Sequence, residues 1–312
     1  MASWSVICFA NEAPEHLKAF VAWHLGLGAE KVHLMLDDPD DGIPELFAHL
    51  PQVETRVFRP KDWPKPADRE KVGRHDRHNT LSTIAYHAVT SDWALHIDVD
   101  EFIFPNDNIG DLLARIPDDI PAIRIYAADR LLSEGYTHWA SDTYRLHTET
   151  RYPDWLEEIY DHPDQFMFGL RGHSNGKLFI RAGVDGLNVM SHRISQENPI
   201  PVKHSKWSDD FTLLHMFVFD YEHYIRKSDW KFIRGPGNQR RDAAIENPTR
   251  RDQRRIELSG AFERGDTDAQ QRIFNDLFVF SDERAARLAK HQRVETFDFT
   301  KPLARYIQQY FP

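Results

Sequence analysis

Apolar and polar positions along the first hundred residues follow two alternating periods. Short runs rich in apolar and β-branched residues are typical of strands, and longer segments between them repeat their apolar residues at the period of a helix. The runs predict strands at 5–10, 31–36, 53–58 and 93–98. The periodic segments predict helices over 14–28, with Leu17, Phe20, Val21, His24 and Leu25 buried, and over 77–89, with Leu81, Ile84, Ala85 and Ala88 packed on a sheet. A short helix is predicted around 44–50.

This alternation of strands and helices predicts a parallel, doubly wound sheet. The second half of the chain is less regular, with strands predicted at 122–128, 177–183 and 213–219 and mostly helix over 221–292. We therefore predict an α/β fold in which a mixed, Rossmann-type sheet is flanked by helices. Its domain is predicted to span residues 1–220, and a mostly helical C-terminal extension over 221–312 is predicted to pack on it.

Composition and charge narrow the class of protein. The 312 residues suffice for a sizeable core, and the formal net charge of −10 argues against general binding to nucleic acid. The first residues resemble no signal peptide, and no run approaches the 18 apolar residues of a membrane span. We therefore expect a cytoplasmic protein without a transmembrane segment, and peripheral contact with a membrane stays open. The single cysteine, Cys8, is expected to be buried and inert.

The stretch IDVDEF at 97–102 places three acids directly after an apolar run. On a strand, Asp98 and Asp100 would share a face about 6–7 Å apart, and Glu101 would point to the opposite face. Two like charges at that spacing repel by roughly a kcal/mol, so we expect a cation between them. Mn²⁺ or Mg²⁺ would suit carboxylate ligands and leave positions open for phosphate oxygens. Paired acids that simply face solvent are the alternative.

Other polar residues fall at predicted strand ends, where ligands bind in open α/β sheets. Asn11 follows the first strand, and Asp37 and Asp38 follow the second in the turn DDPDDG. A calcium loop is excluded there, because Pro39 stands at a ligand position and Ala48 replaces the distal glutamate. An ordinary turn and hydrogen bonding to a nucleoside are equally consistent with this segment.

Two further observations bear on the chemistry. The chain contains no phosphate loop, dinucleotide fingerprint, HExxH, CxxC or GxSxG motif, which argues against a kinase, a zinc protease and a hydrolase triad. His215 lies inside the apolar run LLHMFVF and needs a polar partner there. A hydrogen-bonded core histidine and a ligand-binding histidine are equally consistent with that position.

The segments FANEAPEHLKAFVAWHLGLGAEKVHLMLDDPDDG and DWALHIDVDEFIFP resemble the family 2 glycosyltransferases of the GT-A fold, in a subgroup with an NEA…DVDEF pattern. The resemblance covers residues 5–105 and continues more thinly through GKLFIR, His192 and the stretch HMFVFDYEHYIRK at 215–227, in which Tyr224 and Lys227 are in register. The chain departs from the pattern at Asp220 and in AADRLLSEG at 127–135.

The resemblance implies a metal-dependent, inverting glycosyltransferase with a nucleotide-binding half over 1–105 and an acceptor half over 106–220. Mn²⁺ or Mg²⁺ would be held by Asp98 and Asp100, with His215 (or His192) as a further ligand. The residues implied to bind the nucleotide sugar are Asn11, Glu12, Asp37, Asp38, Arg77, Asn79, Asp98 and Lys227. The candidates for the catalytic base are Asp185, Glu158, Asp129 and His192.

The implied partners are a UDP- or GDP-linked sugar donor and a glycan, lipid-linked or small-molecule acceptor, as in polysaccharide biosynthesis. Two alternatives remain open at this point. One is a phosphoryl or nucleotidyl transferase that uses the same acidic metal site, and the other is a non-catalytic protein that binds sugar nucleotides or glycans. The strand-end acids favour the enzymes over the binding protein.

Overall fold

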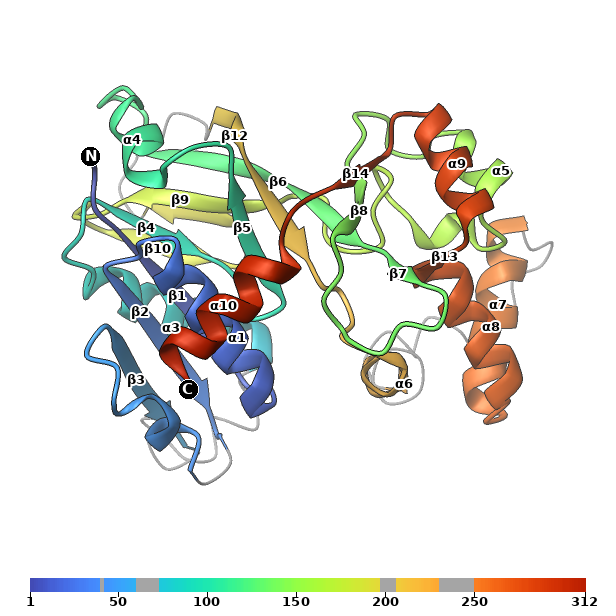
Figure 1. Ribbon diagram of the computed structural model, residues 1–312, viewed down its shortest axis with the longest axis horizontal. Coiled ribbons are helices and arrows are strands. Elements are labelled where there is room, and N and C mark those ends of the chain that lie inside the picture. The colour runs from blue at the N-terminus through green and yellow to red at the C-terminus, as the bar shows by residue number, and fades with distance from the viewer. Residues whose placement is uncertain (40–41, 60–72, 197–205, 230–249) are drawn as a thin grey trace. The chain divides into compact units, whose positions relative to one another are not determined.

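The computed structural model describes residues 1–39, 42–59, 73–196, 206–229 and 250–312 (Figure 1). The chain forms two compact units. The first comprises Met1–Ala127, Asn175–Leu214 and Thr300–Pro312, and the second comprises Ala128–Ser174 and His215–Phe299. The chain thus passes between the units several times, whereas the sequence predicted a single boundary at residue 220.

The core of the first unit is a mixed sheet with helices on its faces. Its parallel part has the order β4-β1-β2-β3, formed by β1 (Trp4–Ala10), β2 (Lys31–Asp37), β3 (Val53–Phe58) and β4 (Trp93–His96). Val6 pairs with Val32 on one side of β1 and with Leu95 on the other. All seven residues of β1 are buried, as expected for a central strand covered on both faces. The predicted parallel sheet is confirmed.

Antiparallel strands extend this sheet beyond β4. The neighbour of β4 is β9 (Lys177–Arg181), in which Phe179 pairs with Leu95, and β9 in turn pairs with the first residues of β6 (Ala122–Arg130). The strand β12 (Lys206–His215) pairs with β6 and with β5 (Glu101–Pro105). The predicted strand over 213–219 therefore ends at His215.

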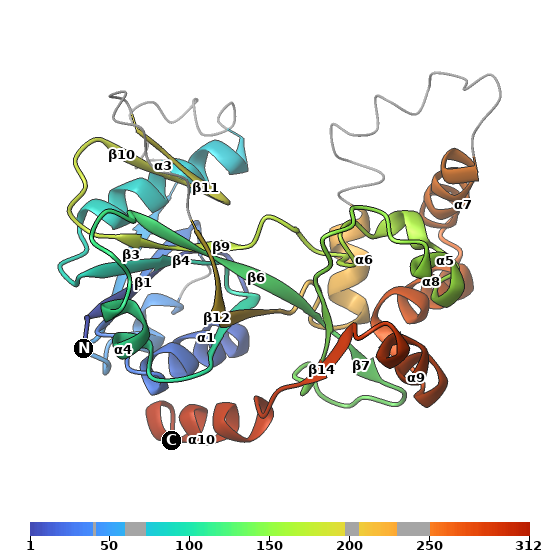
Figure 2. The same cartoon turned by 90° about the horizontal axis from the view of Figure 1, so that it is seen from above.

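Helices cover both faces of the sheet in the first unit. Figure 2 shows α3 (Arg74–His87) with the hairpin of β10 (Leu187–Met190) and β11 (Arg193–Gln196) on one face, and α1 (Pro14–Gly26) with α10 (Thr300–Tyr310) on the other. Opposite faces are expected, because the crossovers through α1 and α3 run in opposite directions along the sheet and right-handed connections then emerge on opposite sides. The other helical segments among the described residues of this unit are η1 (Pro44–Phe47) and α4 (Ile109–Ala114).

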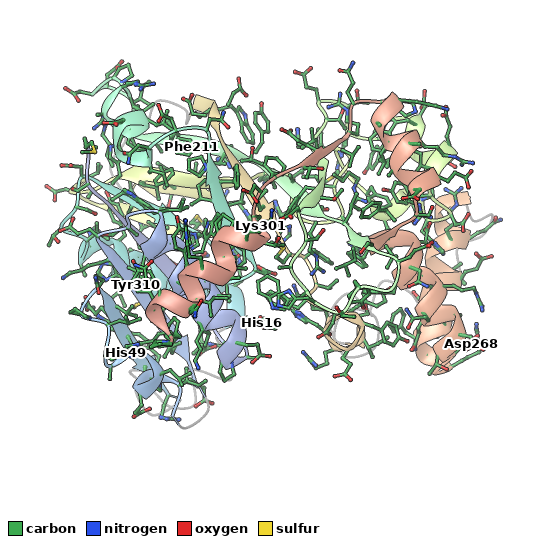
Figure 3. All side chains as sticks on the ribbon, viewed as in Figure 1. His16, His49, Phe211, Asp268, Lys301 and Tyr310 are labelled. Carbon is green, nitrogen blue, oxygen red and sulfur yellow. The ribbon has the colours of Figure 1, made fainter. Side chains whose placement is uncertain are left out.

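The contact between α10 and α1 is close. A Cβ atom at Gly26 would overlap the ring of Tyr306, so glycine is required at this crossing. Near the end of α10, the carbonyl oxygen of Tyr310 accepts a hydrogen bond of 2.8 Å from Nε2 of His49 (Figure 3). The C-terminal helix is thereby fixed on the first unit.

The buried faces of the two long helices test the predicted periodicities. In α1 the five residues predicted to be buried are all buried. In α3 the prediction is wrong at Ile84, of which 41% is exposed, whereas Tyr86 is buried in its place. The hydroxyl of Tyr86 donates a 2.6 Å hydrogen bond to the carbonyl oxygen of Arg181, which explains how the ring lies inward.

The second unit contains the last strands of the same sheet, a separate two-stranded sheet and several helices. The end of β6 pairs with β8 (Thr143–Leu146), which pairs with β14 (Val294–Thr296), and β7 (Leu132–Ser133) pairs with β13 (Val279–Phe280). Its described residues form the helical segments α5 (Trp155–Ile159), η3 (Pro163–Gln165), α6 (Tyr221–Asp229), α7 (Arg250–Glu263), α8 (Thr267–Phe278) and α9 (Asp282–Lys290). In the described part of 221–292 the predicted helices are confirmed.

Sequence explains where two of these helices begin. The side chain of Asp266 accepts a hydrogen bond from the backbone N–H of Ala269 and starts α8, and Ser281 accepts one from Arg284 and starts α9. The apolar faces of these helices join a core that contains Leu156, Tyr224, Leu258, Phe274 and Leu288. No helix among the described residues has both the length and the apolar character needed to cross a membrane.

Candidate functional site

The carboxyl ends of β1 and β4 form the switch point of the parallel sheet. From β1 the chain proceeds outward through β2 to β3, and it then returns to β4 on the other side of β1. Ligands of doubly wound sheets bind in the crevice at such a point. Asn11 follows β1 and Asp98 follows β4, so the strongest acidic motif of the sequence lies at this position.

The acids of IDVDEF are arranged differently from the prediction. The strand β4 ends at His96, and a turn at 99–100 leads into β5, so Asp98 and Asp100 do not share a strand face. Glu101 is buried and turns back toward Asp98, because its Oε2 accepts a 2.8 Å hydrogen bond from the backbone N–H of Asp98. The predicted opposite orientation of Glu101 is therefore wrong. The strand was predicted too long because apolar residues continue through the turn.

A buried lysine provides positive charge between two of these acids. The side chain of Lys177, the first residue of β9, has no exposed surface, and its Nζ lies 2.6 Å from Oδ2 of Asp98 and 3.3 Å from Oε2 of Glu101. Burial alone would lower the pKa of Lys177, but the two carboxylates raise it above its ordinary value. Burial alone would raise the pKa of Asp98, yet the charge of Lys177 holds it well below its usual range. Both groups are therefore charged at neutral pH.

Histidines connect Asp98 to a serine. Nε2 of His78, on α3, lies 3.7 Å from Oδ1 of Asp98 and 3.1 Å from Nε2 of His96. Burial, with the neighbouring His78 and Lys177, lowers the pKa of His96 well below its ordinary value. His96 is therefore neutral, and one nitrogen of its ring can accept a hydrogen bond. On its other side, Nδ1 of His78 lies 3.1 Å from the hydroxyl of Ser191.

The residues predicted to bind the nucleotide differ in burial and in their hydrogen-bonding partners. Asp37 was predicted to lie in the turn after the second strand, but it is the last residue of β2 and is buried, with its Oδ2 2.8 Å from Nη2 of Arg77. Asp38 has a positive φ of 56° and lies 3.8 Å from Nη1 of Arg59. Asn79 accepts a hydrogen bond from the N–H of Ser191. Glu12 follows Asn11 after β1 and is partly exposed.

A cavity of about 480 Å³ opens beside this network in the first unit. Four of its lining residues carry basic side chains, namely His75, Arg124, His192 and Arg193. The others are Asn175, Met190, Ser191 and Trp207. Ser191 thus faces the cavity and also contacts His78, which connects the cavity lining to Asp98.

Two of the four candidate bases, His192 and Asp185, belong to the first unit, and of these two only His192 lies near these groups. His192 lines the cavity, and its Nδ1 lies 3.0 Å from the carbonyl oxygen of Gly176, next to Lys177. Because a carbonyl only accepts, Nδ1 carries the hydrogen and Nε2 of the neutral ring carries the lone pair. Asp185 is exposed after β9, which runs antiparallel to β4, so it lies at the opposite edge of the sheet from Asp98.

The remaining predicted site residues belong to the second unit. Glu158 is largely exposed, with Oε2 3.5 Å from Nε2 of His291. Lys227 donates a 2.6 Å hydrogen bond from Nζ to the carbonyl oxygen of Phe217. His215 lies with Nδ1 3.1 Å from Oδ1 of Asp129, so the polar partner it required is a carboxylate.

Asp129 is the centre of a buried polar cluster in the second unit. Its Oδ2 accepts hydrogen bonds from the backbone N–H groups of Arg171 and Gly172 and lies 3.3 Å from Nη2 of Arg145, whose side chain is itself buried. Burial alone would raise the pKa of Asp129, but the hydrogen bond and charge of His215 with the charge of Arg145 lower it to about 2. A carboxylate held this firmly in its charged form is a weak proton acceptor.

The switch point contains possible ligands for the metal that the resemblance implies. Asp98 and Asp100 offer carboxylate oxygens of the kind that Mn²⁺ and Mg²⁺ prefer, and both side chains are partly exposed. One oxygen of Asp98 is bound by Lys177. In the part of the chain that the structure describes, no three His, Cys, Asp or Glu side chains converge on one point. The two carboxylates are thus of the donor type that such an ion takes, and one of them is already paired with Lys177.

Sequence reasoning missed the groups that surround Asp98. Lys177, His78 and His96 near Asp98, and Arg124 at the cavity, had no role in the sequence-based site, although the repulsion among the acids predicted a cation beside them. The only sequence signal for Lys177 is a charged residue at the head of the apolar run KLFIR. Cys8, in contrast, is buried as predicted, and burial together with the charge of Asp98 raises the pKa of its thiol.

Comparison with known proteins identifies no family. No family model matches the chain, and no curated protein matches it. Among solved structures, the crystal structure of a mycobacterial protein is similar with a TM-score of 0.33 and 12% sequence identity, over 61% of this chain and 58% of that one. The chain thus spans little more than half the length of that protein. A likeness at this level supports no argument about function.

Proposed function

We propose that the protein is a metal-dependent, inverting glycosyltransferase of the GT-A type, which moves a sugar from a UDP- or GDP-linked donor to a hydroxyl group. The observation that carries this proposal is the position of Asp98 and Asp100 after β4, at the switch point of a doubly wound sheet. The resemblance of residues 5–105 to family 2 glycosyltransferases supports it.

The donor nucleotide would lie across the carboxyl ends of the parallel strands. Asn11 and Glu12 after β1, with Asp37 and Asp38 at the end of β2, are the groups that would contact the nucleoside. The bidentate contact with Arg77 fixes the orientation of the Asp37 carboxylate before a ligand arrives. Asp100, with Asp98, would hold Mn²⁺ or Mg²⁺, which would neutralise charge on the leaving diphosphate.

His192 is the base that this arrangement favours. In the proposed step, the acceptor oxygen forms a bond to the anomeric carbon while the bond from that carbon to the diphosphate oxygen breaks and its electron pair leaves with the diphosphate. The proton of the acceptor hydroxyl passes to Nε2 of His192. The Gly176 carbonyl orients the ring for this role by accepting from Nδ1.

A panel of nucleotide sugars tests the proposal. The protein is incubated with UDP- and GDP-linked sugars and Mn²⁺ or Mg²⁺, and the released nucleotide is identified by chromatography. Release of UDP or GDP, dependent on the metal and lost in Asp100→Asn, is expected. Release of a nucleoside monophosphate or of inorganic phosphate would instead indicate nucleotidyl or phosphoryl transfer. Absence of binding and of turnover for every donor would contradict the proposal.

A further inference from the structure

The cavity bounded by β6, the β10–β11 hairpin and β12 combines positive charge with an aromatic surface. It has a volume of about 480 Å³, within the range of small-molecule sites and large enough for a sugar ring with a substituent. Among the described residues, its lining contains two arginines and two histidines but no acid, although the chain as a whole has a net charge of −10. Such a local reversal of charge favours an anionic ligand.

Arg124 is held in place by the backbone. Its Nη1 donates hydrogen bonds of 2.5 Å to the carbonyl oxygen of Asn175 and 2.9 Å to that of His192, both at the cavity. Burial lowers the pKa of Arg124. A guanidinium in a protein remains charged, so Arg124 keeps its charge with reduced hydration. A fixed, poorly hydrated guanidinium loses little on binding a carboxylate or phosphate and gains a strong hydrogen bond.

Trp207 provides a flat surface beside this charge. Its ring stacks on Tyr126 with a centroid distance of 3.9 Å and an interplanar angle of 9°, and the guanidinium of Arg124 lies 5.4 Å from its centroid. Arg124 and Tyr126 share a face of β6, two residues apart, and Trp207 lies on the neighbouring strand β12. The indole is therefore held rigidly, yet 37% of the residue is exposed. A large, rigid, partly exposed ring suits the apolar C–H face of a sugar.

We propose that this cavity binds the acceptor, and that the acceptor is a saccharide that bears a carboxylate or a phosphate group. This assignment rests on the proposed glycosyltransferase function. The sugar ring stacks on Trp207, and its anionic group binds Arg124 and Arg193. The hydroxyl to be glycosylated then lies in a cavity that His192 also lines.

The test measures binding of three probes by saturation-transfer NMR and calorimetry. The probes are methyl glucuronide, glucose 6-phosphate and neutral methyl glucoside, and the proteins are wild type, Arg193→Gln, Trp207→Leu and the control Arg115→Gln, which changes an exposed arginine of a surface ion pair. At least one anionic probe is expected to bind at least ten-fold more tightly than methyl glucoside. Arg193→Gln should weaken it at least five-fold, Trp207→Leu should weaken it as well, and Arg115→Gln should leave it unchanged. Comparison of the affinities for methyl glucuronide and glucose 6-phosphate shows whether the cavity prefers a carboxylate or a phosphate.

The remaining outcomes separate this inference from the function on which it rests. Equal binding of the neutral and anionic probes, or unchanged binding in Arg193→Gln, would overturn the inference. Displacement of the probes by UDP or GDP, with weaker nucleotide binding in Arg193→Gln, would assign the cavity to the donor diphosphate; the acceptor assignment would then be wrong and the glycosyltransferase proposal would stand. Selective binding of an anionic probe without any binding of nucleotides would contradict the proposed function and the acceptor role, while retaining the anion site.

Discussion

Nζ of Lys177 lies 2.6 Å from Oδ2 of Asp98, at the point where the parallel part of the sheet meets its antiparallel part. The lysine side chain is completely buried, whereas 35% of the aspartate side chain is exposed. The lysine therefore relies on Asp98 and Glu101 for stabilisation of its charge, and Asp98 is held ionised and oriented in return. The predictions below begin from this pair.

Replacing Lys177 should destabilise the protein strongly. Lys177→Met leaves Glu101 buried and Asp98 partly buried without their cation, and breaking such a pair costs about 3 kcal/mol. The free energy of unfolding, measured by urea denaturation, should fall by this amount. Lys301→Met, on the exposed surface of α10, is the matched control and should change it by less than about 0.5 kcal/mol. The double variant Lys177→Met with Asp98→Asn should recover part of the lost free energy of unfolding. If the effects of the two substitutions on this free energy simply add, Lys177 and Asp98 are not coupled.

Asp37 and Asp38 should differ sharply although they are neighbours. Asp37→Asn disrupts a buried, bidentate contact with Arg77 and should lower the free energy of unfolding by about 2 kcal/mol. Asp38→Asn keeps a residue that tolerates the positive φ and should stay within about 0.5 kcal/mol of wild type. Thermal and urea unfolding of both variants measure this difference in stability. Similar stabilities for the two would mean that the Asp37–Arg77 contact contributes little.

His24 should make stability depend on pH in the acidic range. Burial lowers its pKa to about 3, while the unfolded chain protonates it near pH 6.5. Between these values the unfolded state binds one more proton, so the free energy of unfolding rises with pH by up to about 1.4 kcal/mol per unit from this group. In His24→Leu the slope between pH 4 and 6 should decrease by about that amount. Identical slopes for variant and wild type would show that His24 is protonated in the folded state.

Asp100 should be required for metal-dependent nucleotide binding and not for folding. With Mn²⁺ present, UDP or GDP is expected to raise the melting temperature of the wild type, and EDTA is expected to abolish the effect. In Asp100→Asn the rise should disappear, because a carboxylate that would hold the ion is lost. Asp107→Asn, at an exposed acid paired with Arg115, is the control and should respond like wild type. A full response of Asp100→Asn would remove this residue from the metal site.

The sequence by itself determined the parallel part of the sheet. Short apolar runs between turn residues are typical of strands in a covered sheet, and the helical periodicity between them predicts crossovers that make the strands parallel. The position of Asp98 close to the end of β4 follows from the same pattern, since Asp98 is the first acid after the run WALHI. The helical part of 221–292 was predictable for a similar reason, because caps such as Asp266 and Ser281 are local signals.

Only the tertiary structure decided what surrounds the acids. Lys177 lies 79 residues from Asp98 along the chain, and Arg124, His192 and Trp207 come from separate strands and loops. No local period relates these positions, because their proximity arises from the antiparallel placement of β9, β6 and β12 beside β4. The sequence could state that the charge of Asp98 and its neighbours needs a cation. The packing of a distant strand determined that a buried lysine pairs with Asp98 and Glu101.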